Sequence, residues 1–231
     1  MALIDSSARL KAAVFAARRL EVVLVTFALG AGFPATATAD VPPVSAAARS
    51  AGFVDVRSVI PSALIDLRYA TSNNFTHTPL YPADARCLVH ESMAPGLAAA
   101  AKALAPQGEV LVFWDCYRPH DVQEKMFDVV PDPAWVARPG AYARSHEAGR
   151  SVDVTMASSH RLVDMGTDFD DFSPRALAFA TDGVSADEQA NRGRLRAAMS
   201  AGGLSVYSGE WWHFDGPGAG VGRPILNVPV D

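Results

Sequence analysis

The segment EVLVFWD at residues 109–115 is a run of β-branched and aromatic residues, which is typical of a buried strand. A second strand is predicted over SVDVTM at 151–156, where alternation places Val152 and Val154 on the face opposite Asp153. A third is predicted over ALIDLRY at 63–69. Strands and helices follow one another without regular βαβ order. The sequence therefore predicts an α+β fold with one domain, a mainly antiparallel sheet and helices packed on one face.

Three segments are predicted to be helices. They are the alanine-rich stretch 92–105, the stretch 120–130 that two prolines close, and the stretch 185–199, which begins with capping-box spacing. A last strand is expected to run from Leu204 toward His213.

Residues 1–39 have the features of an export signal: a basic start, an apolar run at 22–33, and small residues before Asp40. The apolar run is shorter than the about 20 residues that a membrane-spanning helix needs. We therefore expect signal cleavage, with an uncleaved anchor as the alternative, and an exported protein that is periplasmic or secreted. Residues 40–51 are predicted to be a mobile lead-in, and residues 52–231 to form one catalytic domain.

The charge balance restricts the partners. Without residues 1–39, the chain has 16 Lys and Arg against 23 Asp and Glu, a formal charge of −7. This acidic balance argues against a nucleic-acid partner.

The two cysteines, Cys87 and Cys116, could form a disulfide in an oxidising compartment or remain as two buried thiols. A bridge would fix the strand end that presents Arg118. Neither cysteine has a second Cys or His at ligand spacing, so neither is a good metal ligand.

Three residues are candidate metal ligands: His146, Asp153 and His213. His146 lies in a polar loop that can fold back toward Asp153, because Gly149 can adopt a backbone conformation closed to other residues. Two imidazoles and one carboxylate leave a coordination position for water. This pattern indicates a catalytic site with one zinc ion, expected at the edge of the sheet.

Glu210, three residues before His213, is the candidate catalytic base. In a straight strand the two side chains would point to opposite faces, so the chain must turn or bulge. Ser208-Gly209 is the predicted place, because a glycine in a strand often marks a bulge or bend. Trp211 and Trp212 are predicted to be core aromatics.

Arg118 in DCYRP follows a buried strand. A guanidinium held there could bind an oxyanion or carboxylate, or it could form a structural salt bridge, and the sequence leaves both open. The acidic segment 164–171 does not have the spacing of a calcium-binding loop.

Two other kinds of hydrolase site are less well supported. The HExxH zinc motif is absent, because Ala94 and Arg150 stand where its second histidine would be. A serine hydrolase site built on Ser145, His146 and Asp153 would lack the G-x-S-x-G turn.

Taken together, several segments resemble the zinc-dependent D-alanyl-D-alanine dipeptidases of the VanX type. The resemblance rests on YATSNNF at 69–75, WDCYRP at 114–119, SHEAGRSVDVT at 145–155, MGTDFD at 165–170, NRGRLRAAM at 191–199 and EWWHF at 210–214. The resemblance covers most of the chain that follows the predicted signal at 1–39. The combination of MGTDFD and EWWHF is more specific than the spacing of the histidine and the aspartate.

The resemblance implies a role for each matched residue. His146, Asp153 and His213 would bind zinc, Glu210 would be the base and Arg118 would steady the transition state. Asp170 would face the free amino end of the dipeptide, with Tyr69 in the substrate pocket. Arg144 departs from the pattern, since a small hydroxyl residue stands there in better-known members.

The function expected from these residues is hydrolysis of D-Ala-D-Ala, a small D,D-dipeptide, in peptidoglycan turnover or recovery of D-Ala. One alternative is a D,D-carboxypeptidase or endopeptidase acting on peptidoglycan. Another is a non-catalytic zinc-bearing module that binds the cell wall, although such a module would not need Glu210.

Overall fold

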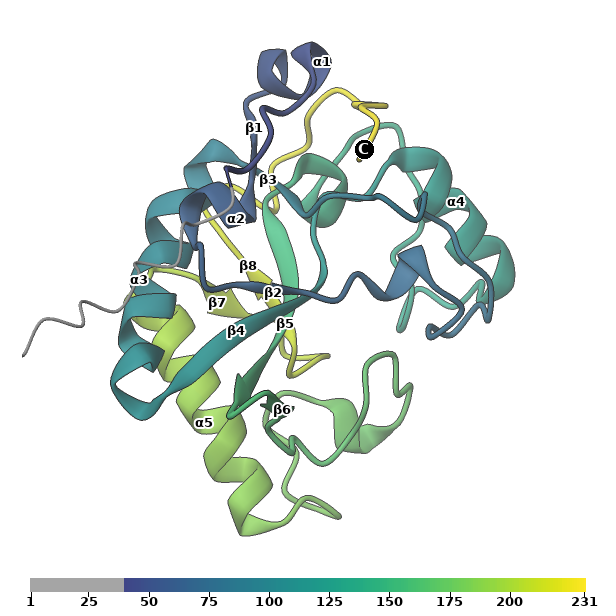
Figure 1. Ribbon diagram of the computed structural model, residues 1–231. Coiled ribbons are helices and arrows are strands. Elements are labelled where there is room, and N and C mark those ends of the chain that lie inside the picture. The colour runs from purple at the N-terminus through teal and green to yellow at the C-terminus, as the bar shows by residue number, and fades with distance from the viewer. Residues whose placement is uncertain (1–39) are drawn as a thin grey trace, which may run out of the picture. The chain divides into compact units, whose positions relative to one another are not determined.

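The computed structural model describes residues 40–231, and the predicted signal at 1–39 lies outside them. The main sheet of this region has the strand order β2-β4-β5-β8-β7, and β6 also pairs with β5 (Figure 1). The strands are β2 (Leu64–Ile65), β4 (Glu109–Asp115), β5 (Ser151–Ser158), β6 (Arg161–Leu162), β7 (Ser205–Val206) and β8 (His213–Asp215). Only β2 and β4 pair in parallel, so the sheet is mainly antiparallel, as predicted.

The remaining elements surround this sheet. A small antiparallel sheet joins β1 (Phe53–Asp55) to β3 (Leu88–His90). The α-helices of the described region are α1 (Ala46–Ser50), α2 (Val56–Val59), α3 (Ala94–Leu104), α4 (His120–Val129) and α5 (Ala186–Ala201). Short 3-10 turns are η1 (Arg68–Ala70), η2 (Glu91–Met93), η3 (Ala105–Gln107), η4 (Ser145–Ala148) and η5 (Pro174–Ala176). Among residues 40–231, no helix has the length and apolar character needed to cross a membrane.

Helices α3 and α5 pack against each other beside the sheet, whereas α4 lies on the other side of it (Figure 1). The predicted packing on one face therefore describes α3 and α5 but not α4. Gly96 in α3 and Gly202 after α5 bring the two backbones into close contact, since a Cβ on either would collide with the other's carbonyl. The predicted capping box, Ser185 with Glu188, begins α5.

Strand pairing separates an apolar face of the main sheet from a polar one. Apolar side chains that are at most 2 % exposed share one face, because partners directly opposite each other point the same way. They are Leu111, Phe113, Val152, Val154, Met156 and Phe214. The register shifts between Phe113 and Asp115, so that Asp115 comes opposite Asp153, and Asp153 in turn pairs with His213. Three polar side chains thus form one row on the other face.

Two predicted strands are shorter than expected. The strand at 63–69 continues only to Ile65, because the chain then tightens into the 3-10 turn η1, where Ala70 donates to the carbonyl of Leu67. The strand expected over 204–213 is split into β7 and β8, which are joined by turns that include Ser208-Gly209.

The segment predicted to be a mobile lead-in, residues 40–51, has packing contacts in the structure. It contains α1, in which Ala48 is buried and Ser45 caps the first turn. The Arg86 guanidinium also donates to the carbonyls of Pro42 and Pro43.

Cys87 and Cys116 are joined in a disulfide that closes a separation of 29 residues. Both residues are buried. The bridge ties the chain just before β3 to the segment after β4 that carries Arg118.

Replacing both cysteines with serine should lower the free energy of unfolding by about 3–4 kcal/mol, because the unfolded chain regains the freedom of a loop of that length. Urea unfolding of the variant and the oxidised wild type would measure the difference. An unchanged unfolding midpoint would contradict a stabilising role for the bridge.

Candidate metal centre and cavity

Three side-chain atoms from separate segments converge on one point. His146 Nε2 lies 3.1 Å from His213 Nδ1 and 3.2 Å from Asp153 Oδ1, and the last two atoms are 3.1 Å apart. A tetrahedral ion with bonds of about 2.0–2.1 Å would hold its ligand atoms about 3.3 Å from one another. The observed separations therefore fit one small tetrahedral metal ion.

The second nitrogen of each imidazole supports this interpretation. His146 Nδ1 donates to the carbonyl of Cys116 at 2.8 Å, and His213 Nε2 lies 3.2 Å from Asp215 Oδ1. When both imidazoles are neutral, these partners hold the ring protons on the outer nitrogens, and both inner nitrogens can then present lone pairs beside a carboxylate oxygen. Three acceptors facing one another need a cation between them, and a metal ion meets that need.

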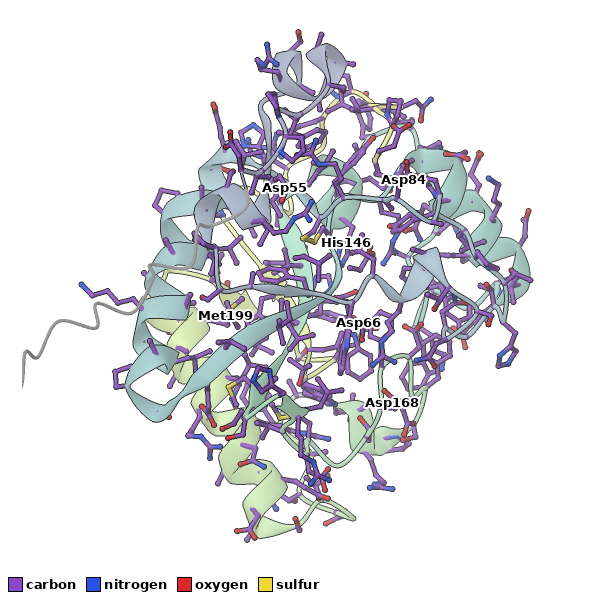
Figure 2. The ribbon with its side chains drawn as sticks, in the orientation of Figure 1. Asp55, Asp66, Asp84, His146, Asp168 and Met199 are labelled. Atoms are coloured by element: carbon purple, nitrogen blue, oxygen red, sulfur yellow. A yellow bond between two sulfur atoms is a disulfide. The ribbon has the colours of Figure 1, made fainter. Side chains whose placement is uncertain are left out.

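The fold positions these ligands by short-range features. His146 lies in η4, which ends at Gly149 with a left-handed φ of 62°, and a Cβ there would collide with the ring of Phe53. The chain then enters β5, which carries Asp153, while β8 carries His213. Because β5 and β8 are interior strands, the site lies over the middle of the sheet instead of at the edge, where it was expected. In Figure 2, His146 lies near the disulfide in the interior of the domain.

The charges of these groups are strongly coupled. Burial acts to raise the pKa of Asp153, but His146 and His213 outweigh it and hold that pKa well below its usual range. Burial acts to lower the pKa of His213, whereas hydrogen bonds to Asp153 and Asp215 raise it to about 10. The cluster therefore favours positive charge at its centre.

Glu210 lies beside this cluster, with its Oε2 atom 3.8 Å from His213 Nδ1. The turns between β7 and β8 bring the two side chains together, as the sequence required. Burial raises the pKa of Glu210 to about 7, and the nearby charge on Asp153 adds to the effect. A carboxylate with such a pKa can accept and return a proton near neutral pH. Trp211 and Trp212 are buried, as predicted for core aromatics.

Arg118 is held firmly at the site. Its Nε and Nη2 donate to Asp115 Oδ2 at 3.0 and 2.7 Å, and its Nη1 donates to Gln123 at 2.7 Å. Burial acts to lower the pKa of Arg118, but Asp115 outweighs it and the pKa lies well above the usual value. Its Nη2 is also 3.9 Å from Asp153 Oδ2. Arg118 therefore forms the structural salt bridge that was one of the two alternatives, and it also lines the cavity. Binding of an oxyanion or carboxylate, the other alternative, stays a prediction.

Asp170 and Tyr69 form a second polar group in the same cavity. The Tyr69 hydroxyl lies 3.1 Å from both carboxyl oxygens of Asp170, and the backbone N–H of Phe75 is 3.4 Å from one of them. Burial raises the pKa of Asp170 well above its usual range, and the charges of Asp153 and Glu210 add to this. A cation that entered the cavity would therefore stabilise the ionised form of Asp170.

A cavity of about 370 Å³ connects these groups. Its lining includes the metal ligands, Glu210, Arg118, Asp170 and Tyr69, so all seven predicted catalytic, metal and substrate residues meet in one space. Residues 133–138, together with Phe75 and Phe172, supply a largely apolar wall. Trp135 stacks on Phe172 with ring centroids 5.3 Å apart.

Sequence reasoning missed several supporting residues. Asp115 binds Arg118 and accepts a hydrogen bond from the Tyr81 hydroxyl at 2.7 Å. Asp215 orients His213, and its place two residues along the same strand was a usable signal, since such residues share a face. No spacing rule pointed to the wall at 133–138.

The less well supported metal and serine sites do not assemble. Within residues 40–231, His146, Asp153 and His213 are the one group of three or more such side chains placed to hold a metal ion. In the acidic segment, Asp164 caps the N–H of Gly166 while Asp170 binds Tyr69. The hydroxyl of Ser145 donates to Ser151 at 2.8 Å and lies 3.4 Å from His213 Nε2, whereas it makes no hydrogen bond to His146, which would be the base of the serine site considered above.

Comparison with known proteins identifies the family of this chain. A family model described as "D-ala-D-ala dipeptidase" matches residues 49–231. A D-alanyl-D-alanine dipeptidase of Escherichia coli (strain K12) is 35 % identical over 174 residues, covering 75 % of this chain and 88 % of that protein. A D-alanyl-D-alanine dipeptidase of Enterococcus faecium is 30 % identical over 189 residues, covering 71 % of this chain and 90 % of that protein.

A third relative, from Enterococcus faecalis (strain ATCC 700802 / V583), has the same description and is 28 % identical over 184 residues. The matched region covers 71 % of this chain and 90 % of that protein. The family match spans the metal centre and its cavity, and the chain belongs to the M15 family of metallopeptidases, within the D-Ala-D-Ala dipeptidases.

Proposed function

We propose that this protein binds one zinc ion and hydrolyses D-Ala-D-Ala to two molecules of D-Ala. The observation that carries the proposal is the convergence of His146, Asp153 and His213 with Glu210 beside them. The relatives named as D-alanyl-D-alanine dipeptidases support the choice of substrate.

The chain's own residues supply the proton transfers and the charge. His146, Asp153 and His213 would hold the zinc ion, which would make the attacking water more acidic and polarise the peptide carbonyl. Glu210 takes the proton of the attacking water and passes it to the leaving amine. Arg118 donates to the oxyanion that develops on the peptide carbonyl, and Asp115 holds its guanidinium in place beforehand.

Asp170 and Tyr69 select for a free amino end. Burial and two neighbouring carboxylates disfavour the ionised form of Asp170, and the ammonium group of a dipeptide would be the cationic partner that stabilises it. A longer peptide, extended at this end, would leave the carboxyl without that partner. This favours a dipeptidase over a D,D-carboxypeptidase or endopeptidase.

The site of action belongs to the same proposal. The signal-like residues 1–39 and the Cys87–Cys116 disulfide support an exported protein in the periplasm or outside the cell. In that location it would act in peptidoglycan turnover or in recovery of released D-Ala.

The central test measures bound metal and release of D-Ala from D-Ala-D-Ala by the purified protein. One zinc per chain is expected, with activity lost on chelation and restored by zinc. Comparison with a pentapeptide substrate separates the dipeptidase from a carboxypeptidase. Faster cleavage of the pentapeptide would overturn the proposed substrate.

Glu210→Ala should lower kcat by about 10²–10⁴-fold, the usual contribution of a positioned proton carrier. Its zinc content should equal that of the wild type, because Glu210 is not one of the three converging ligands. Metal analysis and steady-state kinetics would check both points, with the exposed Glu124→Ala as the matched control. An inactive variant that had also lost its zinc would contradict the assigned role.

Asp170→Asn should reduce kcat/KM for D-Ala-D-Ala while leaving zinc content unchanged, since the amide keeps the shape but not the charge of the carboxylate. The loss should be much smaller for N-acetyl-D-Ala-D-Ala, which has no ammonium group to bind. Equal losses with both substrates would argue against recognition of the amino end.

A further inference from the structure

We propose that the cavity accepts dipeptides whose amino-terminal D-residue has a large apolar side chain, such as D-Leu-D-Ala, and that a wall of aromatic and aliphatic side chains receives this group. The inference deepens the proposed function and rests on it, because it assumes that a free dipeptide binds with its ammonium at Asp170.

The wall begins at the Asp170–Tyr69 pair. The backbone N–H of Phe75 is 3.4 Å from Asp170 Oδ2, and the Phe75 ring meets the Tyr69 ring nearly at a right angle, with centroids 6.3 Å apart. Phe172 packs against Phe75 at a centroid distance of 5.2 Å, and Trp135 stacks on Phe172 at 5.3 Å. A row of three aromatic rings thus leads away from the carboxyl group that would bind the ammonium.

The position of this row decides which substrate side chain can reach it. In a dipeptide, the ammonium and the first side chain are attached to the same carbon atom. The first side chain of a dipeptide bound at Asp170 would therefore start close to Phe75. The second side chain lies beyond the peptide bond, whose carbonyl faces Arg118 in the proposed mechanism. The aromatic row is thus assigned to the first residue.

The lining on this side is apolar, and its backbone is held in place. Residues 133–137, Pro-Ala-Trp-Val-Ala, contain no polar side chain, and all five line the cavity. The N–H of Trp135 donates to the carbonyl of Asp132 at 3.0 Å, and the side chain of Gln123 donates to the carbonyl of Ala137 at 2.7 Å. A wall fixed in this way can receive an apolar group without first being ordered.

The cavity is larger than two alanine residues require. Its volume of about 370 Å³ falls in the range of sites that take drug-sized ligands, about 300–1,000 Å³. The side chains of D-Ala-D-Ala are single methyl groups, which cannot cover the rings of Phe75, Trp135 and Phe172. Each of these residues is half-buried, so apolar surface remains that a larger side chain can remove from water.

The first test compares kcat/KM of the zinc-loaded wild type for D-Leu-D-Ala, D-Ala-D-Leu and D-Ala-D-Ala. The value for D-Leu-D-Ala should exceed that for D-Ala-D-Ala by about 10-fold, the lower end of what an added methylene contributes in an apolar pocket. D-Ala-D-Leu should show no such gain, because its large side chain is at the other end. A value for D-Leu-D-Ala at or below that for D-Ala-D-Ala would overturn the inference, as would a gain confined to D-Ala-D-Leu.

Two opposite changes connect the preference to the wall. Trp135→Ala removes a ring and Ala134→Phe fills space in the lining. Each variant should lower kcat/KM about 10-fold more for D-Leu-D-Ala than for D-Ala-D-Ala. Phe179→Ala is the matched control, since this exposed ring does not line the cavity, and it should keep the wild-type ratio. An unchanged ratio in both wall variants would contradict the assignment.

Binding without turnover gives a second measurement. Calorimetric titration of the zinc-loaded Glu210→Ala protein should show about 10-fold tighter binding of D-Leu-D-Ala than of D-Ala-D-Ala. Equal affinities for the two dipeptides would count against burial of the side chain in the wall.

These outcomes are separate from those of the proposed function. If the wild type hydrolyses D-Ala-D-Ala and cleaves D-Leu-D-Ala more slowly, the inference fails and the dipeptidase stands. If the zinc-loaded wild type cleaves none of the three dipeptides, the proposed function is wrong and the inference falls with it.

Discussion

The site depends on the register of three neighbouring strands. Asp115, Asp153 and His213 come opposite one another across β4, β5 and β8, because β4 shifts its register between Phe113 and Asp115. In an unshifted pairing Asp115 would lie opposite Val152 and would point toward the apolar face with that residue. The register shift in β4 therefore places Asp115, the carboxylate that holds Arg118, next to the metal-ligand candidates Asp153 and His213.

The same sheet explains which parts of the structure could be predicted from the sequence. The strand predicted over 109–115 matches β4, because its β-branched and aromatic residues favour a strand and the structure buries nearly all of them. The need for a turn between Glu210 and His213 followed from the alternation of side chains in a strand, and the turns are present. The early end of β2 was not predictable, since it depends on the contacts of η1, and the wall at 133–138 depends on loops that meet only in the folded protein.

Two arginines that line the cavity, Arg118 and Arg144, differ in how firmly their guanidinium groups are held by other residues. Arg118 is buried and held by three hydrogen bonds, so its remaining N–H donors can meet a developing charge without a change in the position of the guanidinium. Arg144 is exposed and unbound, so it is suited to a group that arrives from solvent. The acidic groups are divided in a similar way between the metal centre and the Asp170–Tyr69 pair. A small zwitterion complements this distribution of charge better than a neutral peptide segment does.

The Cys87–Cys116 bridge has a consequence for how the protein acquires its metal. These are the chain's only two cysteines, and thiolates are strong ligands for zinc. Zinc that met the reduced, unfolded chain would find sulfur ligands that compete with the two imidazoles and the carboxylate. Oxidation before metal loading removes this competition and fixes the Cys116 carbonyl that orients His146. A maturation in which the disulfide forms before the metal binds would therefore protect the correct coordination sphere.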